Sequence, residues 1–464
     1  MMTIFQPYRS FLSEKANKVQ QLQMEYVTEN KKLKVRLMDI YQTLENIYNP
    51  MGVTVGTYDT PVNFNESLKT PIHRWYGYKE GFSPSFVNEF VSKHSTSSKD
   101  VIFDPFGGVG TTGLEANKMG YQAYLMDVNP LGIFASNVKT RHYSDVEVDH
   151  FVNEINSLRS IDKCPITVSI ENKTIVKYFD EKTWESILQI KSYIIEIGNE
   201  TVRNLFSLAL LSLIEEISTH HKNGNGVKKK RILPEPLSFS ALKGKMVEKL
   251  SMYYEDIKST NINGDTTIFY QSNLEEYVLP SKVDIVLTSP PYANCFDYSK
   301  VYLTELWVGG FFTTKEDQKQ FRDKSVISHV HYRWNPRNET YGANIINNLI
   351  VPILEKKDLW SNNIIPMLKG YFSDMGKFLF NLSKNLNEGA TVGIVVGNSV
   401  YGGTPIATDI ILAKQAEELG YKCINIKVYR KVIASSQQMI ILSDYEKKFV
   451  RESLVVLKWL GEAK

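Results

Sequence analysis

The order of apolar and polar positions predicts strands and helices that alternate along most of the chain. Short apolar runs typical of buried strands occur at 101–103 and 122–129, within 266–277 and 283–292, and at 392–397 and 439–444. Between several of these runs, apolar residues recur at helical spacing, for example over 205–218 and 409–419. This alternation is typical of an α/β fold, in which a mainly parallel sheet carries helices on both faces.

Three stretches depart from this alternation. Residues 1–69 carry apolar positions at roughly helical spacing among many charges and predict a helical N-terminal extension. Residues 146–265 are mostly helical in pattern, and residues 313–365 are rich in polar and aromatic side chains. We therefore expect one main domain formed by 70–145 and 266–464, with 146–265 and 313–365 as insertions.

Composition and charge narrow the class of protein only a little. The chain has 464 residues, of which 42% are hydrophobic and 23% are charged, with a net charge of +3, as in an ordinary globular protein. Cys164, Cys295 and Cys423 show neither paired nor metal-binding spacing, which argues against a disulfide framework or a zinc site. No apolar run approaches the roughly 18 residues of a membrane span, and no signal peptide is evident, so we expect a cytoplasmic protein.

The string FDPFGGVGTT, residues 103–112, has the composition of a ligand-binding turn. Its glycines permit a tight turn and close approach of a ligand at the start of the helix that follows. Asp127 ends the next predicted strand, where an acid can accept hydrogen bonds from ribose hydroxyls. These features suit NAD as well as S-adenosylmethionine. Asp104 favours S-adenosylmethionine, because a carboxylate there can neutralise the ammonium group of a ligand.

The predicted strand 283–288 ends in the unusual string Ser-Pro-Pro-Tyr, residues 289–292. Two prolines stiffen the chain and cannot continue a central strand. FDPFGGVGTT and TSPPY resemble the methionine-binding and catalytic motifs of the S-adenosylmethionine-dependent DNA amino-methyltransferases. The resemblance implies a Rossmann-like methyltransferase sheet, S-adenosylmethionine as the cofactor, and methylation of an exocyclic amino group of a base.

The same resemblance assigns roles to the four residues of the SPPY loop. The side chain of Ser289 and the carbonyl of Pro290 are expected to accept hydrogen bonds from the target amino group, and Pro291 helps to stiffen the loop. Tyr292 is expected to stack on the base after it leaves the duplex. The methyl group then passes directly and in line, without a covalent nucleophile, so catalysis rests on positioning and electrostatics.

Cofactor contacts are expected from four parts of the chain. Residues 82–84 match a segment that precedes the first strand in this family, and Asn273 stands where the family usually has an acid beside the adenine ring. The full set of expected cofactor-binding residues is Phe82, Ser83, Pro84, Asp104, Pro105, Phe106, Gly108, Gly110, Thr111, Thr112, Asp127 and Asn273. No metal is expected.

Double-stranded DNA is the expected partner, together with a cognate restriction or defence-system protein. The basic loop within 220–231 is the clearest local cluster of positive charge, and such side chains contact phosphates. The residues expected to contact DNA are Lys228, Lys229, Lys230, Arg231, Arg333 and Arg337. Asn398 and Ser399 are expected to face the target pocket.

Several functions stay open at this point. Serine in the first catalytic position is commoner in the cytosine-N4 branch of the family, so cytosine N4 is the leading target and adenine N6 the next. Methylation of RNA bases, a catalytically silent nucleic-acid-binding partner, and an NAD-linked oxidoreductase are the remaining alternatives. The bare glycine spacing is all that favours the oxidoreductase.

Overall fold

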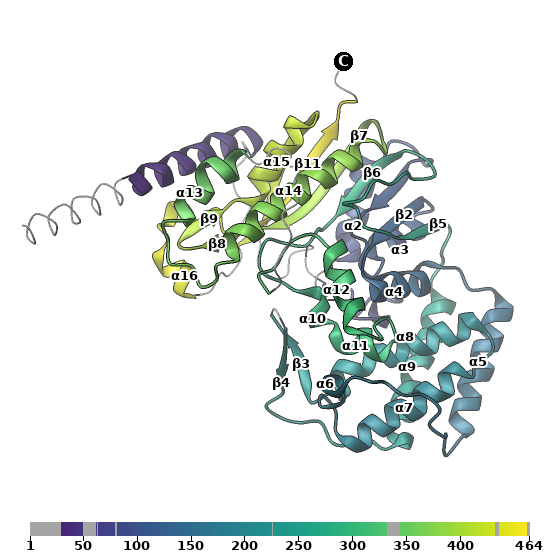
Figure 1. The fold of residues 1–464 in the computed structure, drawn as a ribbon. Coiled ribbons are helices and arrows are strands. Elements are labelled where there is room, and N and C mark those ends of the chain that lie inside the picture. The colour runs from purple at the N-terminus through teal and green to yellow at the C-terminus, as the bar shows by residue number, and fades with distance from the viewer. Residues whose placement is uncertain are drawn as a thin grey trace, which may run out of the picture.

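The computed structural model describes residues 29–49, 62, 64–78, 81–224, 226–331, 344–431 and 436–461. Within these ranges the centre of the molecule is a seven-stranded sheet in the order β10-β11-β7-β6-β1-β2-β5 (Figure 1). The strands are β1 (Val101–Asp104), β2 (Gln122–Asp127), β5 (Asp265–Tyr270), β6 (Val283–Thr288), β7 (Leu386–Gly397), β10 (Tyr421–Lys431) and β11 (Arg451–Trp459). The α/β class expected from the sequence is confirmed.

Most of the sheet is parallel. The β1 strand pairs in parallel with β2 on one side and β6 on the other, and β2–β5 and β6–β7 are parallel as well. The β11 strand runs antiparallel between β7 and β10. Because β1, β2 and β6 run in the same direction, their carboxyl ends lie at one edge of the sheet, which is where ligands bind in open α/β folds.

Helices cover both faces of the sheet (Figure 1). On one face, α2 (Pro84–His94) and α3 (Thr111–Lys118) bury apolar side chains against Ile102, Ile285 and Val395. On the other face, α14 (Ile364–Ser383), α15 (Thr408–Glu418) and the helix over 29–48 pack around Phe103 and Val286. The alternation of side chains along each strand produces these two cores.

A buried ion-pair cluster fastens the helix over 29–48 to the sheet. The guanidinium of Arg451 on β11 binds both carboxylate oxygens of Glu45, at 2.7 and 2.5 Å, and its Nε binds Asp409 Oδ2 at 2.8 Å. Arg451 has no exposed surface. This N-terminal helix is therefore packed against the domain that contains the sheet.

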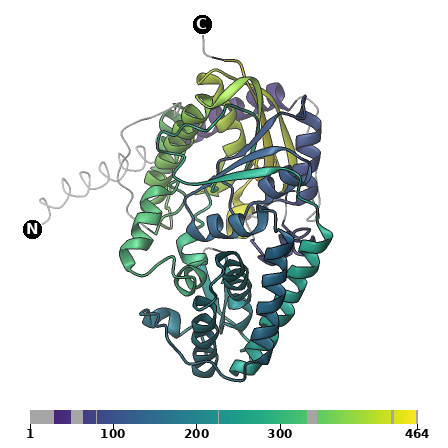
Figure 2. The same cartoon turned by 90° about the vertical axis from the view of Figure 1, so that its right-hand side faces the viewer.

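A helical lobe lies below the sheet in the view of Figure 2. It follows α4 (Pro130–Thr140) and contains α5 (Asp145–Ser160), α6 (Lys173–Val176), α7 (Glu181–Ile195), α8 (Glu200–Ile217), α9 (Phe239–Ser259) and the hairpin of β3 (His220–Asn223) and β4 (Gly226–Lys229). Its core also takes in residues from η1 (His73–Trp75) and α11 (Leu303–Val308), so segments far apart in sequence build it.

The remaining elements lie around the lobe and the far edge of the sheet. They are α10 (Tyr298–Val301), α12 (Lys315–Lys324), the π-helical turn η2 (Ile346–Ile350), α13 (Val351–Leu354), β8 (Ser399–Tyr401), β9 (Thr404–Ile406), α16 (Ser436–Ile441) and α17 (Asp444–Lys447). No helix of the described ranges combines the length and apolar character needed to cross a bilayer.

One expectation about local structure was wrong. Residues 436–441 form a helix, α16, in which Ile440 and Ile441 are exposed, and the last strand is β11 instead. The short apolar run of 439–442 has no alternation to distinguish a strand from a helix, whereas 451–459 is buried on both faces. Within the expected insertion 313–365, η2 and α13 place Ile346, Ile350 and Leu354 in the core.

Candidate active site

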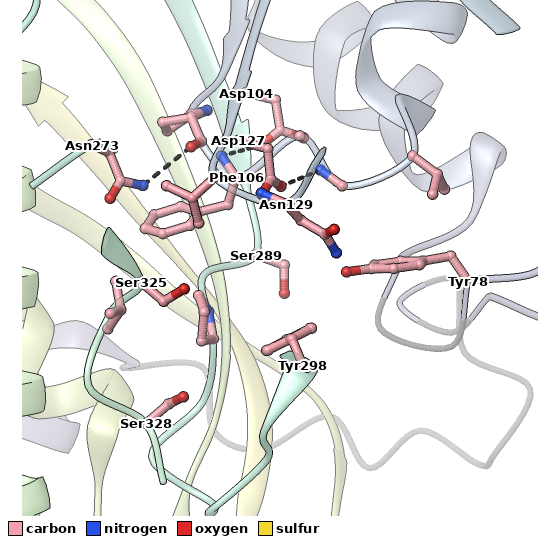
Figure 3. A pocket seen from close by; sticks show the side chains of 18 of the residues that line it. Tyr78, Asp104, Phe106, Asp127, Asn129, Asn273, Ser289, Tyr298, Ser325 and Ser328 are labelled. Atoms are coloured by element: carbon pink, nitrogen blue, oxygen red, sulfur yellow. Dashed lines mark hydrogen bonds between the residues drawn. The ribbon is translucent and has the colours of Figure 1, made fainter. Parts of the chain in front are cut away.

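A pocket opens where β1, β2 and β6 end (Figure 3). It encloses about 940 Å³, its mouth included, which is within the usual range for a ligand site. The glycine turn after β1 and the SPPY loop after β6 both line it, through Gly108 and Ser289 among others. The two motifs, distant in sequence, thus face one cavity.

Asp104, the last residue of β1, links the two motifs directly. Its carboxylate accepts hydrogen bonds from the Thr112 hydroxyl of α3 and from the Thr288 hydroxyl of β6, each at 2.7 Å. It also accepts the N–H of Phe106 at 3.1 Å. Burial raises the pKa of Asp104 to about 6, against the lowering effect of these three donors. A buried carboxyl with so high a pKa is a natural partner for a cation.

The glycine turn depends on positive φ angles and lies against Tyr78. Gly110 caps the N-terminus of α3 with φ +83° and Gly108 has φ +50°, conformations that favour glycine. A Cβ on Gly108 would lie 3.3 Å from the ring of Tyr78, which covers the turn from the pocket side. The turn is therefore tightly covered, and a larger residue here would displace Tyr78.

Asp127 closes the next strand and holds the turn in place. Its Oδ2 accepts the N–H of Gly108 at 2.8 Å, and its Oδ1 accepts the N–H of Asn129 at 2.8 Å. Burial raises the pKa of this carboxyl, while the backbone donors lower it. Since a carboxylate has about four acceptor positions, Asp127 can still accept bonds from a ligand.

The SPPY loop presents its serine to the pocket and turns its tyrosine away. Figure 3 shows Ser289 near the middle of the pocket, with Asp104 and Asp127 on one side and Tyr298 on the other. The ring of Tyr292 lies against Gly397 on β7, and its hydroxyl donates to Glu452 Oε1 at 2.9 Å. Tyr292 is not a lining residue, so the expected stacking role does not fit its position. Tyr298 lines the pocket instead.

The opposite wall comes from α12 and the residues after it, up to His329. There the buried carboxylate of Asp297 accepts from Arg322 Nη2 at 3.1 Å and lies 3.7 Å from His329 Nε2. Burial lowers the pKa of His329 to about 4, so its ring is neutral near pH 7. This wall lies within the insertion 313–365 expected from the sequence, although no local motif marks it as part of the pocket.

Comparisons with known proteins agree with this geometry. The family model N6_N4_Mtase, described as DNA methylase, matches residues 10–133. The type II methyltransferase M.BsoBI of Geobacillus stearothermophilus is 26% identical over 457 residues, which cover 85% of this chain and 87% of that protein. The type II methyltransferase M.AvaI of Nostoc sp. is 26% identical over 436 residues, which cover 85% and 88%. The chain is thus similar to DNA amino-methyltransferases in its two motifs and over most of its length.

This similarity supports a DNA methyltransferase and implies the use of S-adenosylmethionine. Among solved structures, the rRNA methyltransferase aviRa from Streptomyces viridochromogenes aligns over 84% of this chain and 85% of its own. Its TM-score is 0.27 at 8% sequence identity, a similarity too low to bear on function.

The cofactor residues expected from the sequence fall into two groups. Those that line the pocket are Phe82, Asp104, Pro105, Phe106, Gly108, Thr111, Asp127 and Asn273. Those behind the lining are Ser83, which caps α2, Pro84 at its first turn, Gly110 and Thr112. The side-chain amide of Asn273 donates to the carbonyl of Pro105 at 3.1 Å, which ties the two sides of the lining together.

Among the expected catalytic residues, Ser289 and Pro291 line the pocket, while Pro290 is buried behind it. Asn398 lies away from the pocket lining, because its side chain is buried and binds Asp409 and the carbonyl of Phe449. Ser399 is buried on β8 and is also absent from the lining. The expectation for 398–399 was therefore wrong.

The basic cluster of this methyltransferase lies on the β3–β4 hairpin, whose β4 strand contacts α10 at the edge of the pocket. Lys228, Lys229 and Arg231 are exposed. Lys230 is already used in the fold, because its ammonium donates to the carbonyls of Glu215 and Glu216 at 2.7 and 2.8 Å. Arg333 and Arg337 lie outside the described residues.

Proposed function

We propose that this enzyme transfers a methyl group from S-adenosylmethionine to the N4 amino group of cytosine in double-stranded DNA. The observation that carries the proposal is the shared pocket of the glycine turn and the SPPY loop, joined by the Thr288–Asp104 hydrogen bond. A cofactor site and an amino-group acceptor in one cavity meet the basic requirement of direct transfer, which is proximity.

The residues of the pocket fit S-adenosylmethionine at each of its parts. Asp104 is a buried carboxyl with raised pKa and suits the ammonium of the methionine end. Asp127, beside the N-terminal turn of α4, suits ribose hydroxyls, and Asn273 with Phe106 suits a planar adenine. When bound, the cofactor supplies an electrophilic methyl group on a positively charged sulfur.

Ser289 and the rest of the pocket would prepare the base. An exocyclic nitrogen is a weak nucleophile because its lone pair is delocalised into the ring. A hydrogen bond from the amino group to Ser289 Oγ favours a more tetrahedral nitrogen whose lone pair is directed at the methyl group. Tyr298 is placed to stack on a base that has left the duplex, since an enzyme cannot reach this nitrogen inside a stacked pair.

The hairpin of β3 and β4 would hold the DNA backbone beside the pocket. Lys228, Lys229 and Arg231 offer exposed positive charge near α10, and phosphate contacts of this kind fix register without reading sequence. The relatives are named type II methyltransferases, so we propose that this enzyme is likewise the modification partner of a restriction nuclease.

Nucleoside analysis tests the proposal. Duplex DNA incubated with enzyme and isotopically labelled S-adenosylmethionine is digested and analysed by mass spectrometry, with structured RNA in a parallel reaction. We expect labelled N4-methylcytosine from DNA. Ser289→Ala should lower turnover by about a hundredfold, as for loss of one positioned polar contact to the reacting group. Ser157→Ala, at an exposed position on α5, serves as control.

Three results would speak against parts of the proposal. N6-methyladenine as the sole product would replace cytosine by adenine, the alternative target. Methylated RNA without methylated DNA would overturn the assignment of substrate. Binding of S-adenosylmethionine with no methylated base in either nucleic acid would favour a catalytically silent partner.

A further inference from the structure

A chain of hydrogen bonds runs from the pocket serine to a buried carboxylate behind it. Ser289 Oγ lies 3.3 Å from the hydroxyl of Tyr292, and that hydroxyl lies 2.9 Å from Glu452 Oε1. The other oxygen of Glu452, Oε2, accepts from Arg430 Nε at 2.5 Å. Glu452 is 4% exposed and pairs with Gly397 across β11 and β7. Tyr292 packs over this pair.

The chemistry of the members gives the chain a direction. A carboxylate has no proton to donate, so the single hydroxyl proton of Tyr292 must point at Glu452. The Tyr292 oxygen can then only accept in its contact with Ser289, and the Ser289 proton must point at Tyr292. Burial is the main cause that raises the pKa of Tyr292 well above its ordinary value, and the negative charge of the neighbouring Glu452 raises it further. The phenol therefore keeps its proton.

This direction of the hydrogen bonds determines what Ser289 can offer to a ligand in the pocket. With its proton engaged behind the loop, its oxygen offers only lone pairs to whatever enters the pocket. A serine hydroxyl left free can act as donor or acceptor, unlike a carboxylate or an amide oxygen, which accept only. A serine in this position therefore needs an outside group to make it a dedicated acceptor.

We propose that Glu452, held by Arg430 and acting through Tyr292, is the positioning residue that fixes Ser289 as an acceptor for the amino group of the target base. This inference rests on the proposed function, because it assumes that a base amino group faces Ser289. It also gives Tyr292 a task that its place outside the pocket lining allows.

Two variants and a matched control test this hydrogen-bond relay, which runs from Glu452 through Tyr292 to Ser289. Tyr292→Phe keeps the ring against Gly397 and removes the hydroxyl, and Glu452→Gln introduces an amide that can donate to Tyr292 and so reverse the chain. Tyr421→Phe is the control, because Tyr421 is a buried tyrosine on β10 whose hydroxyl donates to the carbonyl of Leu379 at 2.8 Å. It loses a comparable hydrogen bond away from the pocket.

Single-turnover methylation, cofactor affinity and DNA affinity are measured for each variant, with thermal unfolding as a check on folding. Both relay variants should turn over about tenfold more slowly, the effect of one lost hydrogen bond expressed in the transition state. Their affinities for S-adenosylmethionine and DNA should stay within about twofold of wild type, and Tyr421→Phe should keep its rate. A folded Tyr292→Phe enzyme with a wild-type rate would overturn the inference.

A double variant distinguishes orientation of Ser289 by Tyr292 from a general structural role of Tyr292. In a Ser289→Ala background, Tyr292→Phe should cause no further loss of rate, because the group that it orients is gone. Rate losses that multiply would mean that Tyr292 acts independently of Ser289 and would refute the relay. Failure of the proposed function looks different, since the wild-type enzyme itself would then methylate no amino group of any base.

Discussion

Protonation of Asp104 should control the affinity of the enzyme for S-adenosylmethionine. This carboxyl is 3% exposed, and burial raises its pKa from the ordinary 3.8 to about 6. A bound ammonium group favours the ionised form, so the cofactor and a proton compete for Asp104. Binding should therefore weaken as the pH falls through about 6.

The size of the effect follows from the pKa. At pH 5, one pH unit below a pKa of about 6, roughly one tenth of the free enzyme carries an ionised Asp104, so the Kd should be about tenfold higher than at pH 7. The ligand does not add to this change, because an α-amino group titrates only near about 7.7–8.0.

Folding stability should show the opposite trend for the same group. The folded pKa of Asp104 lies above the unfolded value, so between about pH 4 and 6 the folded enzyme binds more protons than the unfolded chain. The contribution of Asp104 to the free energy of unfolding is therefore largest at acid pH and falls as the pH rises through about 6. Cofactor binding opposes this trend, since the bound cation favours the charged form.

Isothermal titration between pH 5 and 7 measures the Kd directly. Two controls distinguish the effect of protonating Asp104 from that of protonating the neighbouring Asp127, whose pKa is also raised. One is 5′-methylthioadenosine, which keeps the ribose and adenine but lacks the amino group, and its affinity should not change through Asp104. The other is Asp104→Asn, which should bind S-adenosylmethionine more weakly and without the pH dependence.

Two results would refute the reasoning. An affinity for S-adenosylmethionine that is constant from pH 5 to 7 would show that Asp104 does not face the ammonium. A tenfold pH effect that persists in Asp104→Asn, or that 5′-methylthioadenosine shares, would assign the titration to another group, with Asp127 first in line.

Two further predictions concern the hairpin and the N-terminal helix. Changing Lys228 and Lys229 together to Ala should weaken DNA binding and make the slope of log K against log salt shallower by about 2, if each contacts one phosphate. An unchanged salt slope in a binding titration would place the DNA elsewhere. Arg451→Met should lower the free energy of unfolding by about 3–5 kcal/mol, because it leaves the buried carboxylates of Glu45 and Asp409 unpaired. Denaturant unfolding checks this, and a loss below about 1 kcal/mol would contradict it.

The sequence predicted those parts of the site that depend on local chemistry. Glycines at 108 and 110 are needed where φ is positive, and an acid at the end of β1 is a local feature of the turn. A proline pair cannot lie inside a central strand, because proline has no N–H for the ladder. The SPPY loop was therefore expected at the end of a strand. Alternating apolar runs were also enough to indicate the parallel α/β sheet.

The parts that the sequence did not predict depend on tertiary contacts. The wall formed by α12 and His329 enters the pocket because of how the chain returns from the helical lobe, and no spacing in the sequence marks that return. Lys230 looked identical to its neighbours in a run of cations, yet it binds two carbonyls at the end of α8. Likewise, the sequence favoured stacking of Tyr292 on the base. In the structure, the hydroxyl of Tyr292 binds Glu452 of β11, a contact that no local pattern predicts.

The contact between Thr288 and Asp104 explains why two motifs 184 positions apart can act on one reaction. The strands that carry them are parallel neighbours, with Phe103 opposite Val286, so their last residues reach the same level of the sheet. Thr288 directly precedes Ser289, and its hydroxyl is held by the carboxylate that we assign to the cofactor's ammonium. The start of the catalytic loop is thereby fixed relative to the cofactor site before either ligand binds, and such preorganisation lets neighbouring groups accelerate a direct transfer.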